Sequence, residues 1–223
     1  MGGGAGVDPG PGARRGDERA RIKRFDAFKR EILNAPNMIT IGRLFLIPPV
    51  LVLIDKTDPY KCVYAMGIFM LASILDLVDG WLARRSGLET VFGKFVDPLA
   101  DKIMVAAVLV YLVGEDRVPA WMVVLLITRE FYISGLRSLA SSEGVVIAAG
   151  AGGKAKTVFQ LVGICFLLVH YRYRMLGTDA WVDFNKVGIV VLGISLLASV
   201  ISAIQYTFGF KDAMATQRSS DRE

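Results

Sequence analysis

Six long apolar segments constrain this chain more than any other feature of its sequence. Each is close to the roughly 20 residues that a helix needs to cross a bilayer. They lie near residues 38–55, 60–85, 93–114, 118–139, 154–173 and 184–209. Overall, 53% of the residues are hydrophobic and the mean hydropathy is +0.47, too apolar for an ordinary soluble domain. The sequence therefore predicts an all-α integral membrane protein with six transmembrane helices, the first kinked by Pro48 and Pro49.

The residues outside these segments complete a predicted division of the chain into four parts. Residues 1–17 are rich in glycine and contain two prolines, which predicts a disordered tail. Four apolar side chains recur at helical spacing within residues 18–35: Ile22, Phe25, Phe28 and Ile32. With Lys and Arg between them, they predict an amphipathic interfacial helix beside the membrane, although a solvated helix or a disordered tail remains an alternative. A six-helix catalytic membrane domain would then occupy residues 36–210, followed by a cytoplasmic tail at 211–223.

The distribution of Lys and Arg predicts which side of the membrane each connection faces. Residues 1–36 contain eight of these cations, and such basic flanks remain in the cytoplasm. Six spans then place both termini in the cytoplasm and three connections on the opposite side: residues 56–59, 115–117 and 174–183. The net charge of +5 and the isoelectric point near 9.3 fit basic flanks facing anionic lipid better than a nucleic-acid partner.

Four aspartates lie in or next to the second and third apolar segments: Asp76, Asp79, Asp97 and Asp101. Their i,i+3 and i,i+4 spacings place each pair on one helix face. Two helices joined by a short loop are antiparallel neighbours, so the two acidic faces can point at each other. Ionised carboxylates are costly in hydrocarbon unless they meet cations. Because carboxylate oxygens suit magnesium or manganese, the pattern predicts one or two divalent ions at these residues.

The residues beside the aspartates suggest what such ions would act on. Gly80 and Ala83 lie close to Asp79 on the same helix and leave room for a flat group, and Arg84 brings a positive charge that can meet phosphate. Paired metals typically stabilise the attacking and leaving oxygens of a phosphoryl group. Taken singly, each of these residues has an alternative explanation: Gly80 and Ala83 could serve close helix packing, and Arg84 could be an interfacial anchor.

The spacing of these residues resembles the signature of the CDP-alcohol phosphotransferase family. The pattern D-x2-D-G-x2-A-R-x8-G-x3-D-x3-D is matched at every fixed position: Asp76, Asp79, Gly80, Ala83, Arg84, Gly93, Asp97 and Asp101. The resemblance implies a six-helix membrane fold, usually a homodimer, that holds two divalent ions (Mg²⁺ or Mn²⁺) at the cytoplasmic side. It also implies a location in the bacterial cytoplasmic (inner) membrane, with the active site facing the cytoplasm.

The resemblance also implies roles for individual residues. Asp76, Asp79 and Asp97 would ligate metal, and Asp101 would be the catalytic base and a possible ligand of the second metal. The CDP-lipid site would be formed by six residues: Pro36, Asn37, Gly80, Ala83, Arg84 and Thr90.

Further runs resemble the branch of the family that transfers the phosphatidyl group of CDP-diacylglycerol to glycerol 3-phosphate. They lie at residues 37–43, 92–102, 128–137 and 153–157, so that the resemblance spans roughly residues 34–208. A small dianionic acceptor beside four carboxylates calls for compensating cations, and arginine suits phosphate. Five basic residues are predicted near the cytoplasmic face for this purpose: Arg43, Arg129, Arg137, Lys154 and Lys156. Alternatively, each is an interfacial anchor or a partner of Glu130.

Other functions remain open from the sequence. A sibling enzyme that uses inositol phosphate also needs a cationic pocket, whereas an enzyme that uses phosphatidylglycerol as the acceptor fits the basic cluster less well. A membrane ion transporter or metal sensor is the non-enzyme alternative, because intramembrane carboxylates also mark ion pathways. Against it, the acids gather at one face and the chain shows no obvious internal repeat.

Overall fold

The structure, a computed structural model, describes five stretches of the chain: residues 35–55, 57–86, 91–143, 152–174 and 179–220. Some side chains within helices also lie outside the described part: those of residues 35–37, 77, 79–86, 91–98, 101, 152–155 and 216–220. The expected tail at 1–17, the interfacial helix up to residue 34 and Thr90 therefore fall outside the described residues.

The regular structure of the described chain consists of helices and one small hairpin. Its elements are α2 (Ala35–Phe45), α3 (Ile47–Leu53), α4 (Pro59–Ser86), α5 (Val91–Gly114), α6 (Ala120–Ser142), α7 (Gly152–Val169), β1 (Arg172–Arg174), β2 (Trp181–Asp183) and α8 (Phe184–Ser220). Every predicted apolar segment is thus largely helical. The first segment is divided at Leu46, where α3 begins with prolines in its first turn, so the predicted break is confirmed.

The end of the fifth apolar segment differs from the prediction. Helix α7 ends at Val169 instead of continuing to residue 173, and His170 has a φ of 64°. The chain then forms an antiparallel hairpin that pairs Arg172 with Asp183 and Arg174 with Trp181. A hydropathy pattern extends across Tyr171 and Tyr173 because it does not distinguish an aromatic strand from the end of a helix.

The described helices contain one candidate membrane span by length and composition. It is the stretch Phe184–Ala215 of α8; shorter apolar stretches lie at Met38–Leu53, Lys102–Gly114 and Lys156–Val169. The six predicted spans are therefore not confirmed. Charged residues such as Asp76 and Arg129 interrupt the apolar stretches of α4 and α6, which lowers their hydropathy even though both helices are long.

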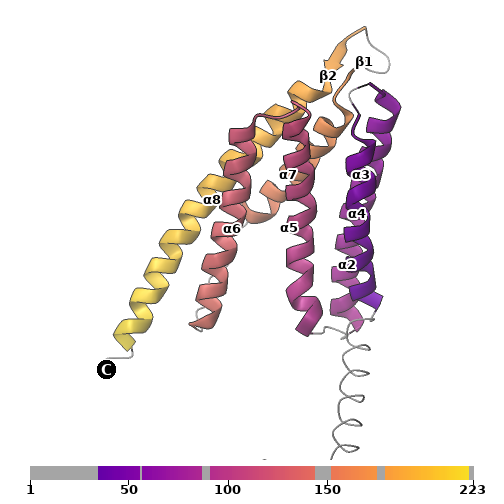
Figure 1. Cartoon of the computed structure of the whole chain (residues 1–223). Helices are drawn as coiled ribbons and strands as arrows, with labels where there is room; N and C mark the ends of the chain where they lie inside the picture. Colours follow the sequence, from indigo (N-terminus) through magenta and orange to yellow (C-terminus); the bar gives the residue numbers. More distant parts are fainter. Residues whose placement is uncertain (1–34, 56, 87–90, 144–151, 175–178, 221–223) are drawn as a thin grey trace, which may run out of the picture.

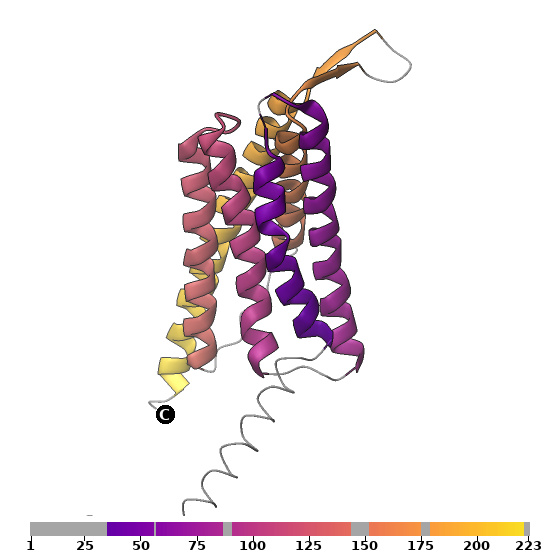
Figure 2. The same cartoon turned by 45° about the vertical axis from the view of Figure 1, so that its right-hand side comes forward.

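The long helices run up and down the bundle (Figures 1 and 2). The hairpin projects from one end, and the C-terminal end of α8 lies at the opposite end. Helix α2 packs on both α4 and α5, and α8 packs on α6 and α7. The later halves of α4 and α6 and the first halves of α5 and α7 consequently lie together at the end away from the hairpin.

Helices α7 and α8 approach each other closely because each carries a glycine at the contact. A Cβ atom added at Gly188 would lie 2.8 Å from Leu167 Cγ and 2.9 Å from the Leu167 backbone nitrogen. At Gly163 it would lie 3.1 Å from the Leu192 backbone nitrogen. Neither position has room for a side chain unless the partner helix moves.

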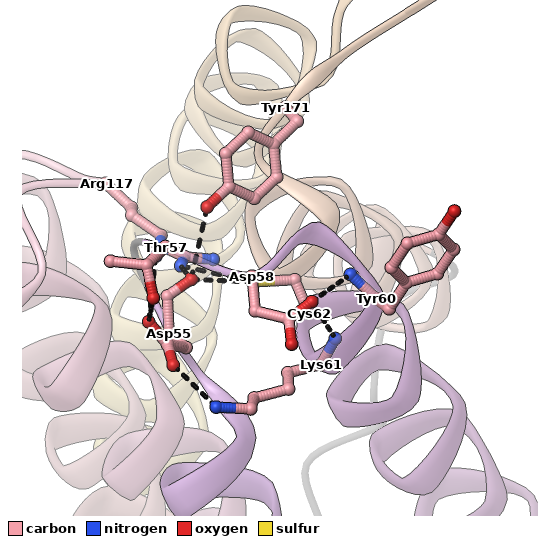
Figure 3. A network of polar contacts seen from close by, with 8 residues as sticks. All are labelled: Asp55, Thr57, Asp58, Tyr60, Lys61, Cys62, Arg117 and Tyr171. Atoms are coloured by element: carbon pink, nitrogen blue, oxygen red, sulfur yellow. Dashed lines mark hydrogen bonds and ion pairs between the residues drawn. The ribbon is translucent and has the colours of Figure 1, made fainter.

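A fully buried arginine joins the connections at the hairpin end (Figure 3). Arg117 donates hydrogen bonds to the carbonyl oxygens of Leu168 at 2.9 Å and Asp55 at 3.0 Å, and to Cys62 Sγ at 3.3 Å. The Tyr171 hydroxyl donates to the same Asp55 carbonyl at 3.3 Å. Arg117 therefore satisfies a carbonyl at the C-terminal end of α7 and links it to the α3–α4 and α5–α6 connections.

The Asp55 carboxylate organises the α3–α4 connection itself. It accepts hydrogen bonds from the Thr57 hydroxyl at 2.6 Å, the Lys61 ammonium at 2.9 Å and the Thr57 backbone N–H at 2.8 Å. These donors, the Thr57 hydroxyl foremost, hold the pKa of Asp55 well below its usual range.

Candidate functional site

The four aspartates of the motif lie on α4 and α5, at the end of the bundle away from the hairpin (Figure 1). Asp76 is the one whose side chain is described. Its Oδ1 atom accepts a hydrogen bond from Arg43 Nη1 of α2, in an ion pair. The side chains of Asp79, Asp97 and Asp101 lie outside the described residues, so the facing of the two acidic pairs stays a prediction.

Arg43 is a completely buried cation between the two acid-bearing helices. Its side chain is 0% exposed, and α2 packs on both α4 and α5. Its Nε and Nη2 atoms are buried and make no hydrogen bond within the described part of the chain. Unsatisfied donors on a buried guanidinium are costly. Arg43 is thus suited to bind a further anion while it neutralises Asp76.

The chemistry of the motif fits divalent metal ions. It offers carboxylate oxygens from two turns of α4 and two turns of α5, which are the ligands that hard cations prefer. Asp76 carries a buried cation as its partner, as expected for a carboxylate that stays ionised in an apolar bundle. Among the described side chains, no group of three or more possible metal ligands occurs, because Asp76 is the only described member of the motif.

A second polar cluster joins α6, α7 and α8. Glu130 Oε1 accepts hydrogen bonds from Arg129 Nη1 at 2.9 Å and from Lys156 Nζ at 2.7 Å. Arg129 and Lys156 are 7% and 9% exposed. Arg129 Nε also donates to the Ser199 carbonyl of α8 at 2.9 Å, and Ser195 Oγ donates to the Lys156 carbonyl at 2.8 Å.

Two of the basic residues predicted to bind the acceptor, Arg129 and Lys156, therefore lie close together and pair with the same carboxylate, that of Glu130. Glu130 was expected only as an alternative partner of single basic residues, whereas it holds both Arg129 and Lys156. Its position next to Arg129 in an apolar helix was the available signal. Arg137 lies two turns beyond this cluster on α6 and is exposed.

The remaining predicted site residues are not placed by their side chains. These residues are Pro36, Asn37, Gly80, Ala83, Arg84, Thr90 and Lys154, which lie outside the described side chains. Their proposed roles consequently rest on the sequence pattern.

A cavity of about 60 Å³ lies between α5, α6 and α7, beside Glu130. Lys102, Thr157 and Gln160 also line it. Lys102 Nζ donates a hydrogen bond to Ser134 Oγ at 2.5 Å, and Ser134 Oγ donates to the Glu130 carbonyl at 2.7 Å. The sequence pattern indicates no role for Lys102, Ser134 or Gln160, because the acidic motif ends at Asp101 and these three residues come from three different helices.

Known proteins resemble this chain over most of its length. Residues 33–205 match the protein family described as CDP-alcohol phosphatidyltransferase. A protein of Bacillus subtilis (strain 168) named CDP-diacylglycerol--glycerol-3-phosphate 3-phosphatidyltransferase is 41% identical over 187 residues, which is 78% of this chain and 94% of the relative. A protein of the same name from Rickettsia bellii (strain RML369-C) is 31% identical over 173 residues, 78% of this chain and 93% of the relative.

One solved structure shares the fold. It is the crystal structure of Mycobacterium tuberculosis phosphatidylinositol phosphate synthase in its apo form, with a TM-score of 0.53. The similarity covers 80% of this chain and 90% of that protein at 19% sequence identity. At this identity the likeness concerns the fold alone.

Proposed function

Because the chain belongs to the CDP-alcohol phosphatidyltransferase family, we propose that it transfers the phosphatidyl group of CDP-diacylglycerol to sn-glycerol 3-phosphate, giving phosphatidylglycerophosphate and CMP. The observation that carries this function is the 41% identity, over most of both chains, to a relative named for that reaction. Buried Arg43, Arg129 and Lys156 support it, because a dianionic acceptor needs cations beside the acidic motif.

The family generally uses divalent metal ions, and the motif residues are the candidates to hold them. In this proposal, Asp76, Asp79, Asp97 and Asp101 would hold two ions (Mg²⁺ or Mn²⁺). When bound, they would supply positive charge to the pyrophosphate of the donor.

The residues of the chain would divide the reaction between them. Asp101 takes the proton from the terminal hydroxyl of glycerol 3-phosphate. The hydroxyl oxygen then forms a bond to the phosphorus that carries the diacylglycerol, while the bond from that phosphorus to the CMP oxygen breaks. Arg84 stabilises the charge of the departing CMP. The transferred proton remains on Asp101 until it passes to water.

The two substrates would occupy different parts of the site. Pro36, Asn37, Gly80, Ala83 and Thr90 would line the cytidine diphosphate site together with Arg84. The acceptor phosphate would be bound by basic residues of α2, α6 and α7: Arg43, Arg129, Arg137, Lys154 and Lys156. Glu130 keeps two of these cations in place before the acceptor binds.

The protein would act in the bacterial cytoplasmic membrane, where its family is membrane-associated. We place the active site and both termini on the cytoplasmic side, because the basic N-terminal residues favour that side. The catalytic domain would comprise residues 36–210 and assemble as a homodimer.

The function is tested by CMP release from the purified protein in detergent with CDP-diacylglycerol and Mg²⁺. The acceptors to compare are glycerol 3-phosphate, inositol phosphate, serine and phosphatidylglycerol. We expect CMP with glycerol 3-phosphate and its loss when EDTA is added. CMP release with inositol phosphate alone would assign the chain to the sibling reaction, and no release with any acceptor would refute the enzyme.

A matched pair of variants tests the base. Asp101→Asn should abolish turnover while CDP-diacylglycerol binding is kept. Asp116→Asn is the control: Asp116 is exposed in the α5–α6 connection and has a φ of 56°, which asparagine tolerates. Full activity of Asp101→Asn would remove Asp101 from the base role.

A further inference from the structure

The cavity between α5, α6 and α7 combines a polar end with apolar walls. Lys102, Glu130, Thr157 and Gln160 provide the polar groups, and residues such as Leu109 and Leu126 provide the walls. Since one water needs roughly 10–15 Å³ on this measure, about 60 Å³ has room for about four waters or for a polar group of similar size. The first cavity-lining residue of α5, Lys102, directly follows Asp101.

Lys102 is a cation without a carboxylate partner in the described part of the chain. Its hydrogen bond goes to the neutral Ser134 hydroxyl, whereas Glu130 is engaged by Arg129 and Lys156. An ammonium on an apolar helix is costly unless an anion or several acceptors meet it. Lys102 therefore has the capacity to bind an anionic group inside the cavity.

Gln160 is a buried amide that lacks a hydrogen bond to any described residue. It is 7% exposed and lines the same cavity. The amide atoms of Gln160 are not among the completely buried unpaired atoms, so a small molecule in the cavity can reach them. A ligand with oxygen acceptors and hydroxyl donors would satisfy both ends of this amide.

The lining of the cavity suits an anion that enters it. Lys102 is the cation among the residues that line the cavity, and the Glu130 carboxylate beside it is already engaged by Arg129 and Lys156. A phosphate monoester carries close to two negative charges at neutral pH. Glycerol 3-phosphate would therefore bring Lys102 the negative charge that Glu130 does not supply.

We infer that Lys102 and Gln160 bind the acceptor alcohol: Lys102 binds its phosphate, and Gln160 bonds to the phosphate or to a neighbouring hydroxyl. This inference rests on the proposed function and adds two residues that lie outside the acidic motif. It also explains why a lysine follows Asp101 at the point where α5 enters the cavity.

The test is a steady-state assay of CMP release in which each substrate is varied in turn. Lys102→Met should raise the KM for glycerol 3-phosphate at least tenfold, while the KM for CDP-diacylglycerol changes less than twofold. The kcat of Lys102→Met, measured with saturating glycerol 3-phosphate, should be at least half that of the wild type, because the substitution impairs binding of the acceptor and not the chemical step. Lys102→Arg keeps the charge and should restore most of the affinity.

Two further variants separate binding from folding. Lys211→Met removes an exposed cation of α8 and should leave both KM values unchanged. Gln160→Leu keeps a side chain of similar size and should raise the KM for glycerol 3-phosphate at least about tenfold, as expected for a lost hydrogen bond to a charged ligand. The melting temperature of each variant shows whether it folds. If Lys102→Met does not fold, the KM values of Lys102→Arg and Gln160→Leu test whether these two residues bind the acceptor.

The inference is overturned if Lys102→Met leaves the KM for glycerol 3-phosphate unchanged or raises both KM values equally. The same conclusion follows if Lys102→Arg behaves like Lys102→Met, because a charge would then not matter. Failure of the proposed function looks different: the wild-type protein itself would release no CMP with glycerol 3-phosphate. The wild-type control therefore separates the two failures.

Discussion

Alanine at Gly188 should separate α7 from α8 and lower the stability of the bundle. The added Cβ would lie 2.8 Å from Leu167 Cγ, 2.9 Å from the Leu167 backbone nitrogen and 3.0 Å from Leu167 Cδ2. The Leu167 side chain can rotate away, but its backbone nitrogen can move only with α7. The same helix pair carries the Ser195–Lys156 hydrogen bond, so the shift also reaches the polar cluster.

Two opposing effects decide the magnitude. Overpacking a close contact costs about 1–3 kcal/mol. Alanine is favoured over glycine within a helix by up to about 1 kcal/mol, which offsets part of that cost. With both effects near the middle of their ranges, the net loss is about 1.5 kcal/mol. At about 2–4 °C per kcal/mol for a chain of this length, the melting temperature should fall by about 3–6 °C.

The assay is thermal unfolding of the purified protein in one detergent, followed by intrinsic tryptophan fluorescence. Gly193→Ala is the matched control on α8, because a Cβ there would lie 4.0 Å from Met122 Cε, an ordinary contact. Gly67→Ala on α4 has nothing within 4 Å and should be neutral or slightly stabilising. Equal melting temperatures for the Gly188 and Gly193 variants would refute the close-contact argument.

Three further predictions follow from described contacts. Arg117→Met should lower the free energy of unfolding by about 2–4 kcal/mol, because it leaves buried carbonyls unpaired. Thermal unfolding measures this loss, with the substitution of exposed Arg172 by Met as the control. An unchanged melting temperature of Arg117→Met would contradict the prediction. Glu130→Gln should also lower the melting temperature, because Arg129 and Lys156 lose their carboxylate, and added inorganic phosphate should restore part of the loss; no effect of phosphate would argue against an anion site. The pKa of Asp55 is lower in the folded state than its unfolded value of about 3.9. The ionised Asp55 carboxylate therefore adds to the free energy of unfolding above that pH, and this stabilisation is lost as the pH falls towards the folded pKa. Asp55→Asn should therefore show a flatter dependence of stability on pH below about pH 4, and parallel curves for the two proteins would exclude this role.

The sequence predicted those parts of the molecule that depend on local pattern. Apolar segments marked the long helices, and the adjacent prolines marked the division between α2 and α3. The alternating direction of the long helices was also predicted, and the C-terminal ends of α4 and α6 lie at the same end of the bundle. These features could be predicted because each depends on periodicity or on a single residue type.

The partners of buried charges could not be predicted in this way. Arg117 appeared as part of a polar connection, whereas it is buried and bonded to carbonyls of residues 55 and 168. Arg43 was assigned to the acceptor, yet in the structure it pairs with Asp76. Which carboxylate or carbonyl a long side chain reaches depends on how helices distant in sequence pack, and hydropathy carries no information on that packing.

The Arg117 network fastens α7 at one end, and the polar cluster around Glu130 fastens it near the other. Arg117 donates to the Leu168 carbonyl close to the last residue of α7, whereas Lys156, in its second turn, bonds to Glu130 of α6 and accepts from Ser195 of α8. Between these two attachments, Gly163 and Gly188 allow α7 and α8 to touch. A change in the tilt of α7 would therefore break polar contacts at both ends, so that α6, α7 and α8 are expected to move as one unit.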